Sequence, residues 1–349
     1  MSPRLTVSVV IPTRNRPASL HRLLTALTAQ VRRPEEVIIA DASDTPLDGS
    51  ALALAYPRLA LSWFHMMPSL CAQRNHAISR AKGSHVLLCD DDIEPGPLYL
   101  QRLVAYLDAH PEAGCVSGLV CDPEDVAANA AAFPSPSFRH LLYVFVFQLG
   151  LGGDLAAVKA PTVFTPVLAL LRHWYRRRGN TWSLAGWPLG TQVQRPVVHA
   201  SVGLLGAALV RRTWLLQSPY DERLDALDPH AVGDNYGVAL GFPGVETIAV
   251  LTDLPVGHHR AAENRPDRAT VHYQSMLALH YFMRRSHRFS TANIGWLAWS
   301  LIGNTLRFLR RGETDLVWAS TRALAAIVLR RNPLLSPALD GSVARQASA

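Results

Sequence analysis

Apolar and polar residues alternate along the first third of the chain in blocks that predict strands and helices in turn. The run at residues 7–11 is β-branched and ends at Pro12, which predicts a buried parallel strand. From Ser19, leucines recur at helical spacing up to Leu27, and residues 36–41 form a second apolar run. We therefore expect a βαβ unit whose strands are followed by polar loops.

The same alternation continues to residue 120. Residues 71–82 predict a helix that ends at Gly83, and residues 98–109 predict another helix. The apolar runs that start at residues 85 and 114 predict two further strands. Ligands of open α/β sheets bind at the carboxyl ends of the strands, so the polar loops are the place to look for a site.

Composition limits the classes of protein that this chain could be. With 349 residues and 49% apolar content, it can bury a large core in one large domain or two smaller ones. Its net charge of +7 is carried almost entirely by arginine, which suits phosphates or an anionic membrane surface. The acids are spread along the chain and no tail is basic, so we do not expect a nucleic-acid partner.

The cysteines and the apolar runs bear on the compartment. Cys71, Cys89, Cys115 and Cys121 form no Cys-x-x-Cys pair and lie among apolar residues, which predicts reduced core cysteines in a cytoplasmic protein. The N-terminus has no signal-peptide pattern. No window reaches the ~18 apolar residues that would span a bilayer.

Three consecutive carboxylates, Asp90, Asp91 and Asp92, follow the strand that starts at residue 85. Adjacent carboxylates near a core repel one another and lose hydration, and a divalent cation would relieve both effects. Oxygen ligands suit Mg²⁺ or Mn²⁺ shared with substrate phosphates. The alternatives are a solvated turn after an edge strand and a helix cap. The sequence has neither the Gly-x-Gly-x-x-Gly of dinucleotide folds nor a P-loop lysine motif.

Four motifs together resemble the family 2 glycosyltransferases, which have the GT-A fold. They stand in the family's order and spacing, at residues 9–16, 37–41, 74–83 and 87–92. The resemblance covers about residues 7–120 well and the rest loosely. It implies an α/β fold of the GT-A type: a Rossmann-like mixed sheet flanked by helices, with a helical insertion and a helical C-terminal extension.

The resemblance also implies roles in binding a nucleotide-diphospho-sugar. Pro12 and Thr13 would line the base and ribose site, Asp41 would contact the base, and Arg74 the base or the diphosphate. Asp90 would reach the ribose, and Asp92 would bind the metal that bridges the diphosphate. The residues expected to bind the donor are therefore Pro12, Thr13, Arg14, Asp41, Arg74, Asp90 and Asp91.

A second informative stretch covers residues 227–240. It resembles the family's acidic segment at the start of a helix, which implies that Asp234 is the catalytic base taking the acceptor's hydroxyl proton. Gly233 stands where the family usually has Glu. The alternative role for Asp234 is a helix N-cap, and Asp225 and Asp228 are the next candidates for the base.

Two adjacent histidines, His258 and His259, follow a strand predicted at residues 248–251. Some relatives place a histidine there as a further metal ligand. Side chains of neighbouring residues in extended backbone point in opposite directions, so only one of the two can face the site. We expect that residue to be His258. Upstream, residues 198–210 are rich in small side chains and resemble the strand that positions the sugar.

The resemblance suggests a division of the chain into segments. Residues 1–122 would form the nucleotide-sugar-binding half and residues 197–268 the acceptor-binding half. Residues 123–196 would be a partly helical insertion, residues 269–335 C-terminal helices, and residues 336–349 a disordered tail.

The resulting hypothesis is an inverting glycosyltransferase that depends on Mn²⁺ or Mg²⁺ and transfers one sugar to a glycan or lipid-linked acceptor. Arginines beside Trp and Tyr at residues 172–178, and again in the C-terminal helices, suggest peripheral contact with an anionic membrane on its cytoplasmic side. The alternatives are a nucleotidyltransferase, disfavoured by the absence of a Gly-rich loop after the first strand, and a non-catalytic nucleotide-sugar-binding subunit of a polysaccharide assembly.

Overall fold

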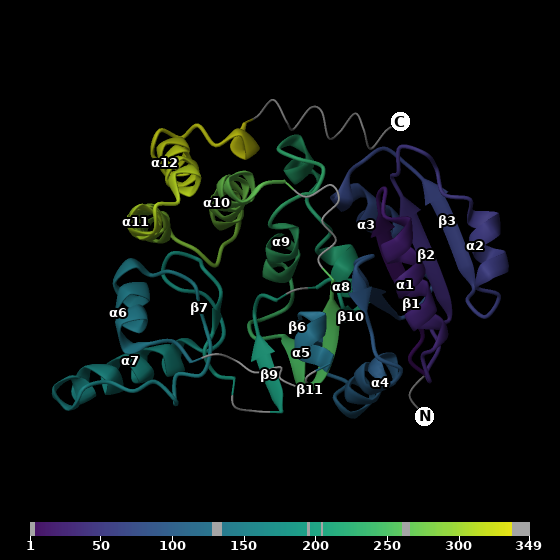
Figure 1. Cartoon of the computed structure of the whole chain (residues 1–349), viewed down its shortest axis with the longest axis horizontal. Coiled ribbons are helices and arrows are strands. Elements are labelled where there is room, and N and C mark those ends of the chain that lie inside the picture. The colour runs from purple at the N-terminus through teal and green to yellow at the C-terminus, as the bar shows by residue number, and fades with distance from the viewer. Residues whose placement is uncertain (1–3, 128–134, 194–195, 204, 260–265, 337–349) are drawn as a thin grey trace.

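The computed structural model describes residues 4–127, 135–193, 196–203, 205–259 and 266–336, and it shows a mixed sheet with helices on both faces (Figure 1). Within these residues, nine strands form one sheet in the order β3-β2-β1-β4-β10-β6-β11-β5, with β9 paired to β11. The predicted disordered tail lies, from residue 337 onward, outside the described residues.

The strands of this sheet are short, apart from β11. Their bounds are β1 (Val7–Thr13), β2 (Glu36–Asp41), β3 (Leu61–His65), β4 (His85–Leu88), β5 (Ile93–Glu94), β6 (Cys115–Cys121), β9 (Val197–Ala200), β10 (Ala208–Arg211) and β11 (Ile248–His258). β7 (Leu151–Gly152) and β8 (Leu189–Gly190) form a separate two-stranded pair.

The helices occupy three regions of the chain. Those of the first third are α1 (Pro17–Thr28), α2 (Gly49–Ala55), α3 (Leu70–Arg80) and α4 (Tyr99–Ala109). Those of the middle are α5 (Pro123–Ala127), α6 (Phe138–Phe147), η1 (Thr162–Phe164), α7 (Thr165–Arg178), α8 (Arg212–Gln217), η2 (Glu222–Ala226) and α9 (Asp234–Leu240). The last are α10 (Arg268–Arg285), α11 (Thr291–Arg311), α12 (Thr314–Val328) and η3 (Pro333–Leu335).

The predicted βαβ unit is present, and its first strand lies inside the sheet. β1 pairs in parallel with both β2 and β4, and all seven of its residues are buried. Alternate side chains enter different cores: Val9 belongs to the cluster that includes residues of α1, α2 and α4, whereas Val10 belongs to the cluster that includes residues of α3, α9, α10 and α12. Burial on both faces explains why the strand sequence is continuously apolar.

Two details of the predicted elements are wrong. Gly83 does not end α3, because the helix stops at Arg80 and Ala81 is already extended. Gly83 instead lies against β1, where it donates from its backbone N–H to Ser8 Oγ at 2.8 Å. A Cβ there would stand 2.7 Å from the Ser8 nitrogen, so the position needs glycine for close approach.

The second error concerns the strands beyond residue 197. Residues 198–210 are not one strand: β9 lies beside β11, while β10 runs antiparallel between β4 and β6. The chain turns at Gly206, whose carbonyl accepts from the Asp90 backbone N–H at 2.9 Å. The strand predicted at residues 248–251 continues to His258 as β11, with an irregularity in register between Leu251 and Pro255.

A third cluster of apolar side chains lies apart from the sheet, between α6, α7, β7 and β8. It packs onto α11, where Trp187 Nε1 donates to Ser300 Oγ at 2.9 Å and Tyr143 Oη donates to the Gly303 carbonyl at 2.5 Å. A Cβ on Gly303 would stand 2.4 Å from the ring of Phe147. The small residue therefore lets α6 and α11 approach closely. The segment boundaries drawn from the sequence stay a prediction.

Tyr99 offers a test of how the sheet is held together. Its buried hydroxyl donates to the Ala207 carbonyl at 2.6 Å and accepts from the Gly118 N–H at 2.9 Å, which ties α4 to β6 and β10. Tyr99→Phe would remove the hydroxyl partner of the buried Gly118 N–H and leave the Ala207 carbonyl with only a long bond from Ser117 Oγ at 3.5 Å. We expect a loss of about 1–3 kcal/mol in the free energy of unfolding, measured by urea denaturation.

Tyr106→Phe is the matched control, since Tyr106 lies on the same helix with a partly exposed side chain. Its variant should unfold at nearly the wild-type urea concentration. Equal losses in both variants would show that the Tyr99 hydroxyl has no special part in joining these elements.

Candidate active site

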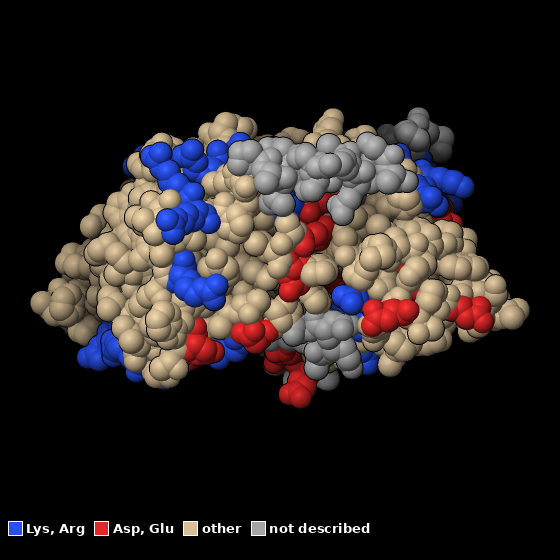
Figure 2. All heavy atoms as spheres, turned by 90° about the horizontal axis from the view of Figure 1, so that it is seen from above, with Lys and Arg blue, Asp and Glu red and all other residues tan. Residues whose placement is uncertain are grey.

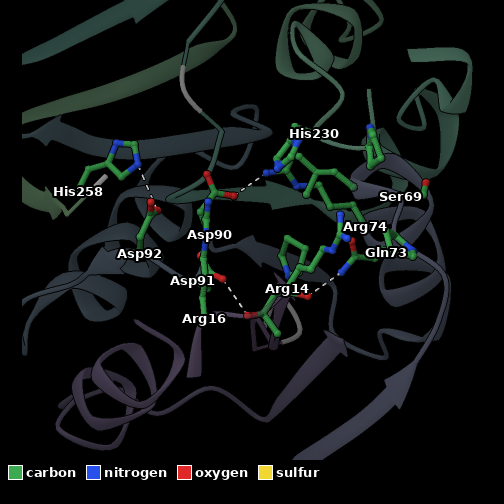
Figure 3. A pocket seen from close by; sticks show the side chains of 15 residues that line it. Arg14, Arg16, Ser69, Gln73, Arg74, Asp90, Asp91, Asp92, His230 and His258 are labelled. Carbon is green, nitrogen blue, oxygen red and sulfur yellow. Dashed lines mark hydrogen bonds and ion pairs between the residues drawn. The ribbon is translucent and has the colours of Figure 1, made fainter. Parts of the chain in front are cut away.

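A cavity of about 220 Å³ opens at the carboxyl ends of β1 and β4, where parallel strands of an α/β sheet place their ligands. Figure 3 shows the three aspartates between His258 on one side and Arg74, Gln73 and Ser69 on the other. Eight of the residues predicted for the site line this cavity: Pro12, Thr13, Arg14, Arg74, Asp90, Asp91, Asp92 and His258.

Asp91 binds the loop after β1 to the loop after β4. Its carboxylate accepts from Thr13 Oγ1 at 2.8 Å and pairs with Arg16 Nη1 at 3.2 Å. Burial raises the pKa of Asp91 to about 6, and Arg16 and Thr13 oppose that rise. Asp91 therefore holds the two loops together, and both of its carboxylate oxygens already have partners in the protein.

Arg74, on α3, connects two carboxylates from distant parts of the chain. Its Nη2 pairs with Asp90 Oδ1 and its Nη1 with Asp234 Oδ2, while its guanidinium lies 4.9 Å from the ring centroid of Tyr220. The side chain is only 4% exposed. Burial would lower the pKa of Arg74, but Asp234 and Asp90 hold it above its ordinary value, so it stays a cation.

Asp234 stands one side chain away from the cavity and does not line it. It is the first residue of α9, after Gly233, whose φ of +95° is the left-handed conformation that favours glycine. Besides the pair with Arg74, Asp234 Oδ1 accepts from the Asn235 backbone N–H at 2.7 Å. Burial raises the pKa of Asp234 above its ordinary value, and the Asp90 charge adds to the rise that Arg74 opposes. A raised pKa suits a group that takes a proton near neutral pH.

Asp92 and His258 meet on the opposite side of the cavity. His258 Nε2 lies 3.1 Å from Asp92 Oδ1, and β11 pairs with β5 at this point through Ile93. The other histidine, His259, is directed elsewhere, and its Nε2 bonds Glu94 Oε2 at 2.5 Å. The two histidines therefore have separate partners, as extended backbone requires.

Asp41 is placed differently from its predicted role. It lies at the end of β2, 2% exposed, and does not line the cavity. Its two oxygens accept from the backbone N–H groups of Ser43 and Leu47, each at 2.9 Å. Burial alone would raise the pKa of Asp41, but hydrogen bonds from the Ser43 side chain, from these two backbone N–H groups and from His65 bring it below its ordinary value. In this structure Asp41 shapes the loop after β2.

Several lining residues were not predicted from the sequence. Gln73, next to Arg74, donates from Nε2 to the Thr13 and Ala40 carbonyls at 3.1 and 2.7 Å and so joins the ends of β1 and β2. Its position beside Arg74 on a helix was the only signal available. The others are Arg16, Pro68, Ser69, Leu70, Pro229 and His230.

The two alternative bases lie at the edge of the cavity. Asp225 Oδ2 accepts from Ser69 Oγ at 2.5 Å, and burial raises the pKa of Asp225 to about 7. Asp228 pairs with the ring of His230 and accepts from its backbone N–H at 2.8 Å. Neither carboxylate lines the cavity, although Ser69 and His230 do.

The donor set can be tested for its fit to a divalent cation. The described residues hold no group of three or more His, Cys, Asp and Glu side chains arranged to bind a metal ion. Mg²⁺ and Mn²⁺ in phosphate-transfer sites, however, commonly use one or two protein ligands and take the rest from water and substrate phosphates. Asp92 and His258, an oxygen and a nitrogen ligand already in contact within the cavity, fit that arrangement.

Comparison with known proteins adds three findings. The family model of Glycosyl transferase family 2 matches residues 8–141. An uncharacterized glycosyltransferase of Bacillus subtilis, YwdF, is 30% identical over 118 residues, 32% of this chain and 43% of that protein. The O-antigen biosynthesis protein RfbC of Myxococcus xanthus is 33% identical over 129 residues, 36% of this chain and 10% of RfbC. The chain thus spans less than half the length of these curated relatives.

Among solved structures, S. aureus TarS 1–349 in complex with UDP-GlcNAc has a TM-score of 0.54 at 14% identity, covering 95% of this chain and 89% of that one. The same segment in complex with UDP has a TM-score of 0.50. At this identity the likeness concerns the fold, which is the GT-A fold predicted from the sequence. Over residues 8–141, the chain is similar to Glycosyl transferase family 2.

Proposed function

We propose that this chain transfers one sugar from a nucleotide-diphospho-sugar to an acceptor hydroxyl, with inversion at the anomeric carbon. The observation that carries the proposal is the cavity at the ends of β1 and β4, where Asp90–Asp92 faces both the loop after β1 and His258. Together with the match of residues 8–141 to Glycosyl transferase family 2, this arrangement supports a donor site. The TarS complex with UDP-GlcNAc makes UDP-sugars the first donors to test.

Different side chains would bind different parts of the donor. Pro12, Thr13 and Arg14, at the end of β1, would hold the nucleoside, and Asp90 would hold the ribose. Arg74 reaches the cavity from α3 as a fixed cation, and a guanidinium binds phosphate oxygens in pairs. Asp41 would act through the loop that it shapes.

Asp92 and His258 would hold Mn²⁺ or Mg²⁺. When bound, such an ion neutralises charge on the departing diphosphate. In the chain itself, Asp92 keeps the imidazole of His258 directed at the cavity through their 3.1 Å contact. The buried carboxylate of Asp91 fixes the loop between them and the nucleoside end of the site.

Asp234 is the proposed base, and Arg74 would control it. In this structure the guanidinium engages both Asp234 and Asp90. A donor diphosphate that attracts Arg74, or a ribose that binds Asp90, would weaken these pairs and free the Asp234 carboxylate for the acceptor hydroxyl. Binding of donor would then precede activation of the acceptor, which limits loss of donor to water.

A non-catalytic nucleotide-sugar-binding subunit is the second candidate. One observation favours it: Asp234 is paired with Arg74 and outside the cavity lining, and Gly233 precedes it. Incubation with UDP-sugars and Mn²⁺ separates the two candidates. Slow metal-dependent release of UDP supports the enzyme, and saturable binding without release supports the subunit.

The acceptor is proposed to be a glycan or a lipid-linked sugar, as in polysaccharide synthesis, which the O-antigen role of RfbC supports. Among the described helices, none has the length and apolar character to cross a bilayer. Separately, we propose peripheral contact with an anionic membrane on its cytoplasmic side, which the arginines and tryptophans of the C-terminal helices support.

The metal assignment predicts a selective loss of donor binding. Asp92→Asn should abolish the Mn²⁺-dependent part of UDP affinity while the protein stays folded, because it removes the charged ligand beside His258. Calorimetric titration of UDP with Mn²⁺ and with EDTA measures this part. Asp253→Asn is the control, since Asp253 pairs with Arg102 on the exposed surface. Unchanged Mn²⁺-dependent affinity in Asp92→Asn would place the metal ligand elsewhere.

The base assignment predicts that a variant loses transfer rate but keeps its affinity for the donor. Asp234→Asn keeps a hydrogen-bond acceptor for Arg74 but is a far weaker base, so transfer should fall ~10²–10⁴-fold. UDP affinity should stay within a few-fold of wild type. Near-normal transfer would instead direct attention to Asp225 and Asp228, through the same assay on Asp225→Asn and Asp228→Asn. Unfolding of Asp234→Asn would identify the ion pair with Arg74 as structural.

A further inference from the structure

Helices α11 and α12 expose apolar side chains that the core does not use. On α11 these are Trp299, Ile302, Leu306 and Leu309, between 39% and 56% exposed. Their spacing of three and four residues places them along one face of the helix. A different face of α11 carries Leu297, Leu301 and Phe308, which are buried. Of the outer residues, Trp299 also stacks on Phe147 of α6 and donates from Nε1 to the Val146 carbonyl at 2.9 Å, whereas Ile302, Leu306 and Leu309 lie outside the buried clusters.

The outer side of α12 continues the same surface. Trp318 is 70% exposed, and Val328 and Leu329, at the other end of the helix, are 62% and 60% exposed. An apolar groove runs between the two helices, lined by Gly295, Ala298, Trp299, Ile302, Thr321, Leu324, Ala325, Val328 and Leu329. We call Trp299, Ile302, Leu306, Leu309, Trp318, Val328 and Leu329 the apolar face. Contiguous exposed apolar surface of this kind marks an interaction site.

A strongly basic cavity adjoins the apolar face where α11 ends beside α6. It is lined by Arg139, His140, Tyr143, Arg307, Arg310 and Arg311, and we call it the arginine cavity. Leu306 and Arg310 are four residues apart on α11, so the two features share an edge. Figure 2, seen from above in the view of Figure 1, shows Lys and Arg side chains gathered over the left part of the molecule, where Figure 1 places α11 and α12.

The arginine cavity has little counter-charge within the described part of the chain: Glu313 acts on Arg307 from nearby but is not part of the lining. No carboxylate lines it, and none of its arginines forms an ion pair there, whereas Arg16, Arg74 and Arg102 all do. Arg307 Nε is buried with no hydrogen-bond partner. Burial lowers the pKa of Arg307 and Arg311 lowers it further, while Tyr143 and Glu313 oppose the decrease. Clustered cations in partly buried surroundings favour an anion with several acceptor oxygens, such as a phosphate.

We propose that the apolar face and the arginine cavity together dock the chain on an anionic lipid bilayer. Lipid phosphates would occupy the arginine cavity, and the apolar face would enter the boundary between headgroups and acyl chains. Trp at the rim and Arg beside an apolar helix face are the side chains that this boundary favours. The complementary charge of anionic headgroups selects a membrane over an uncharged apolar partner.

This inference names the surface that would make the proposed membrane contact. It rests on the proposed function only in taking the acceptor to be lipid-linked. It also selects between two basic regions of the chain. The arginines at the end of α7 lie exposed on a different helix, with Arg176 and Arg177 in its last turn. They provide a control of equal charge.

The test is sedimentation with phosphatidylcholine vesicles, with and without phosphatidylglycerol, at low salt. The wild type should bind only the anionic vesicles and dissociate at high salt. Each basic residue near such a surface contributes roughly fivefold in affinity, so Arg310→Gln/Arg311→Gln should bind on the order of 10- to 30-fold more weakly. Leu306→Gln/Leu309→Gln should also bind more weakly. Arg176→Gln/Arg177→Gln should bind nearly as the wild type does.

Three results would overturn the inference. Equal weakening by the Arg176/Arg177 and Arg310/Arg311 variants would mean that net charge alone attracts the protein. Failure of the wild type to bind anionic vesicles, with concentration-dependent dimers that Leu306→Gln/Leu309→Gln dissociates, would assign the apolar face to a second copy of the chain. Binding of the wild type to vesicles of pure phosphatidylcholine would show that docking does not require the arginines.

Circular dichroism and thermal unfolding should be unchanged in all of these variants, since the altered side chains are exposed or line an open cavity. Donor hydrolysis without vesicles should also be unchanged. Conversely, Asp92→Asn should bind vesicles normally. Failure of the docking surface and failure of the donor site are therefore measured separately.

Discussion

The buried guanidinium of Arg74 is the interaction on which the arrangement of the site depends. It brings together Asp90, after β4, and Asp234, at the start of α9, residues that lie far apart in the chain. A cation at this depth needs partners, because an unpaired buried charge is strongly destabilising. Its two carboxylates therefore fix α9 against the sheet, and Tyr220 closes the group from one side.

The parts of this fold that could be predicted from sequence are those encoded by local periodicity. β1, α1 and β2 follow from β-branched runs and from leucines at helical spacing, and the polar strand ends locate the cavity. β9 and β10 could not be predicted as two strands, because their separation depends on Gly206. A Cβ at Gly206 would stand 2.1 Å from Asp90 Oδ2, a contact between segments distant in sequence.

The same limit applies to individual side chains of the site. The motifs predict Asp92 and His258 as metal ligands, and the pairing of β5 with β11 brings their side chains to 3.1 Å from each other. Asp41 carries the same motif signal, yet the backbone N–H groups of Ser43 and Leu47 use its carboxylate. The sequence carries almost no indication that Gln73 lines the site. Whether a polar side chain faces a ligand or a loop depends on the backbone groups that need a partner, and sequence patterns do not report those groups.

The architecture places two kinds of electrostatics in separate regions. In the donor cavity, cations are engaged by carboxylates, so incoming phosphates must compete for Arg74. No carboxylate of the described residues lines the arginine cavity, so an anion that binds there displaces no ion pair within it. The first arrangement suits selective binding coupled to a change in the site, because the ligand must displace an internal partner. The second suits reversible attachment that salt can weaken. A chain that modified acceptors at a membrane would need both: a surface that holds it there, and a site that stays closed by its own ion pairs until donor arrives.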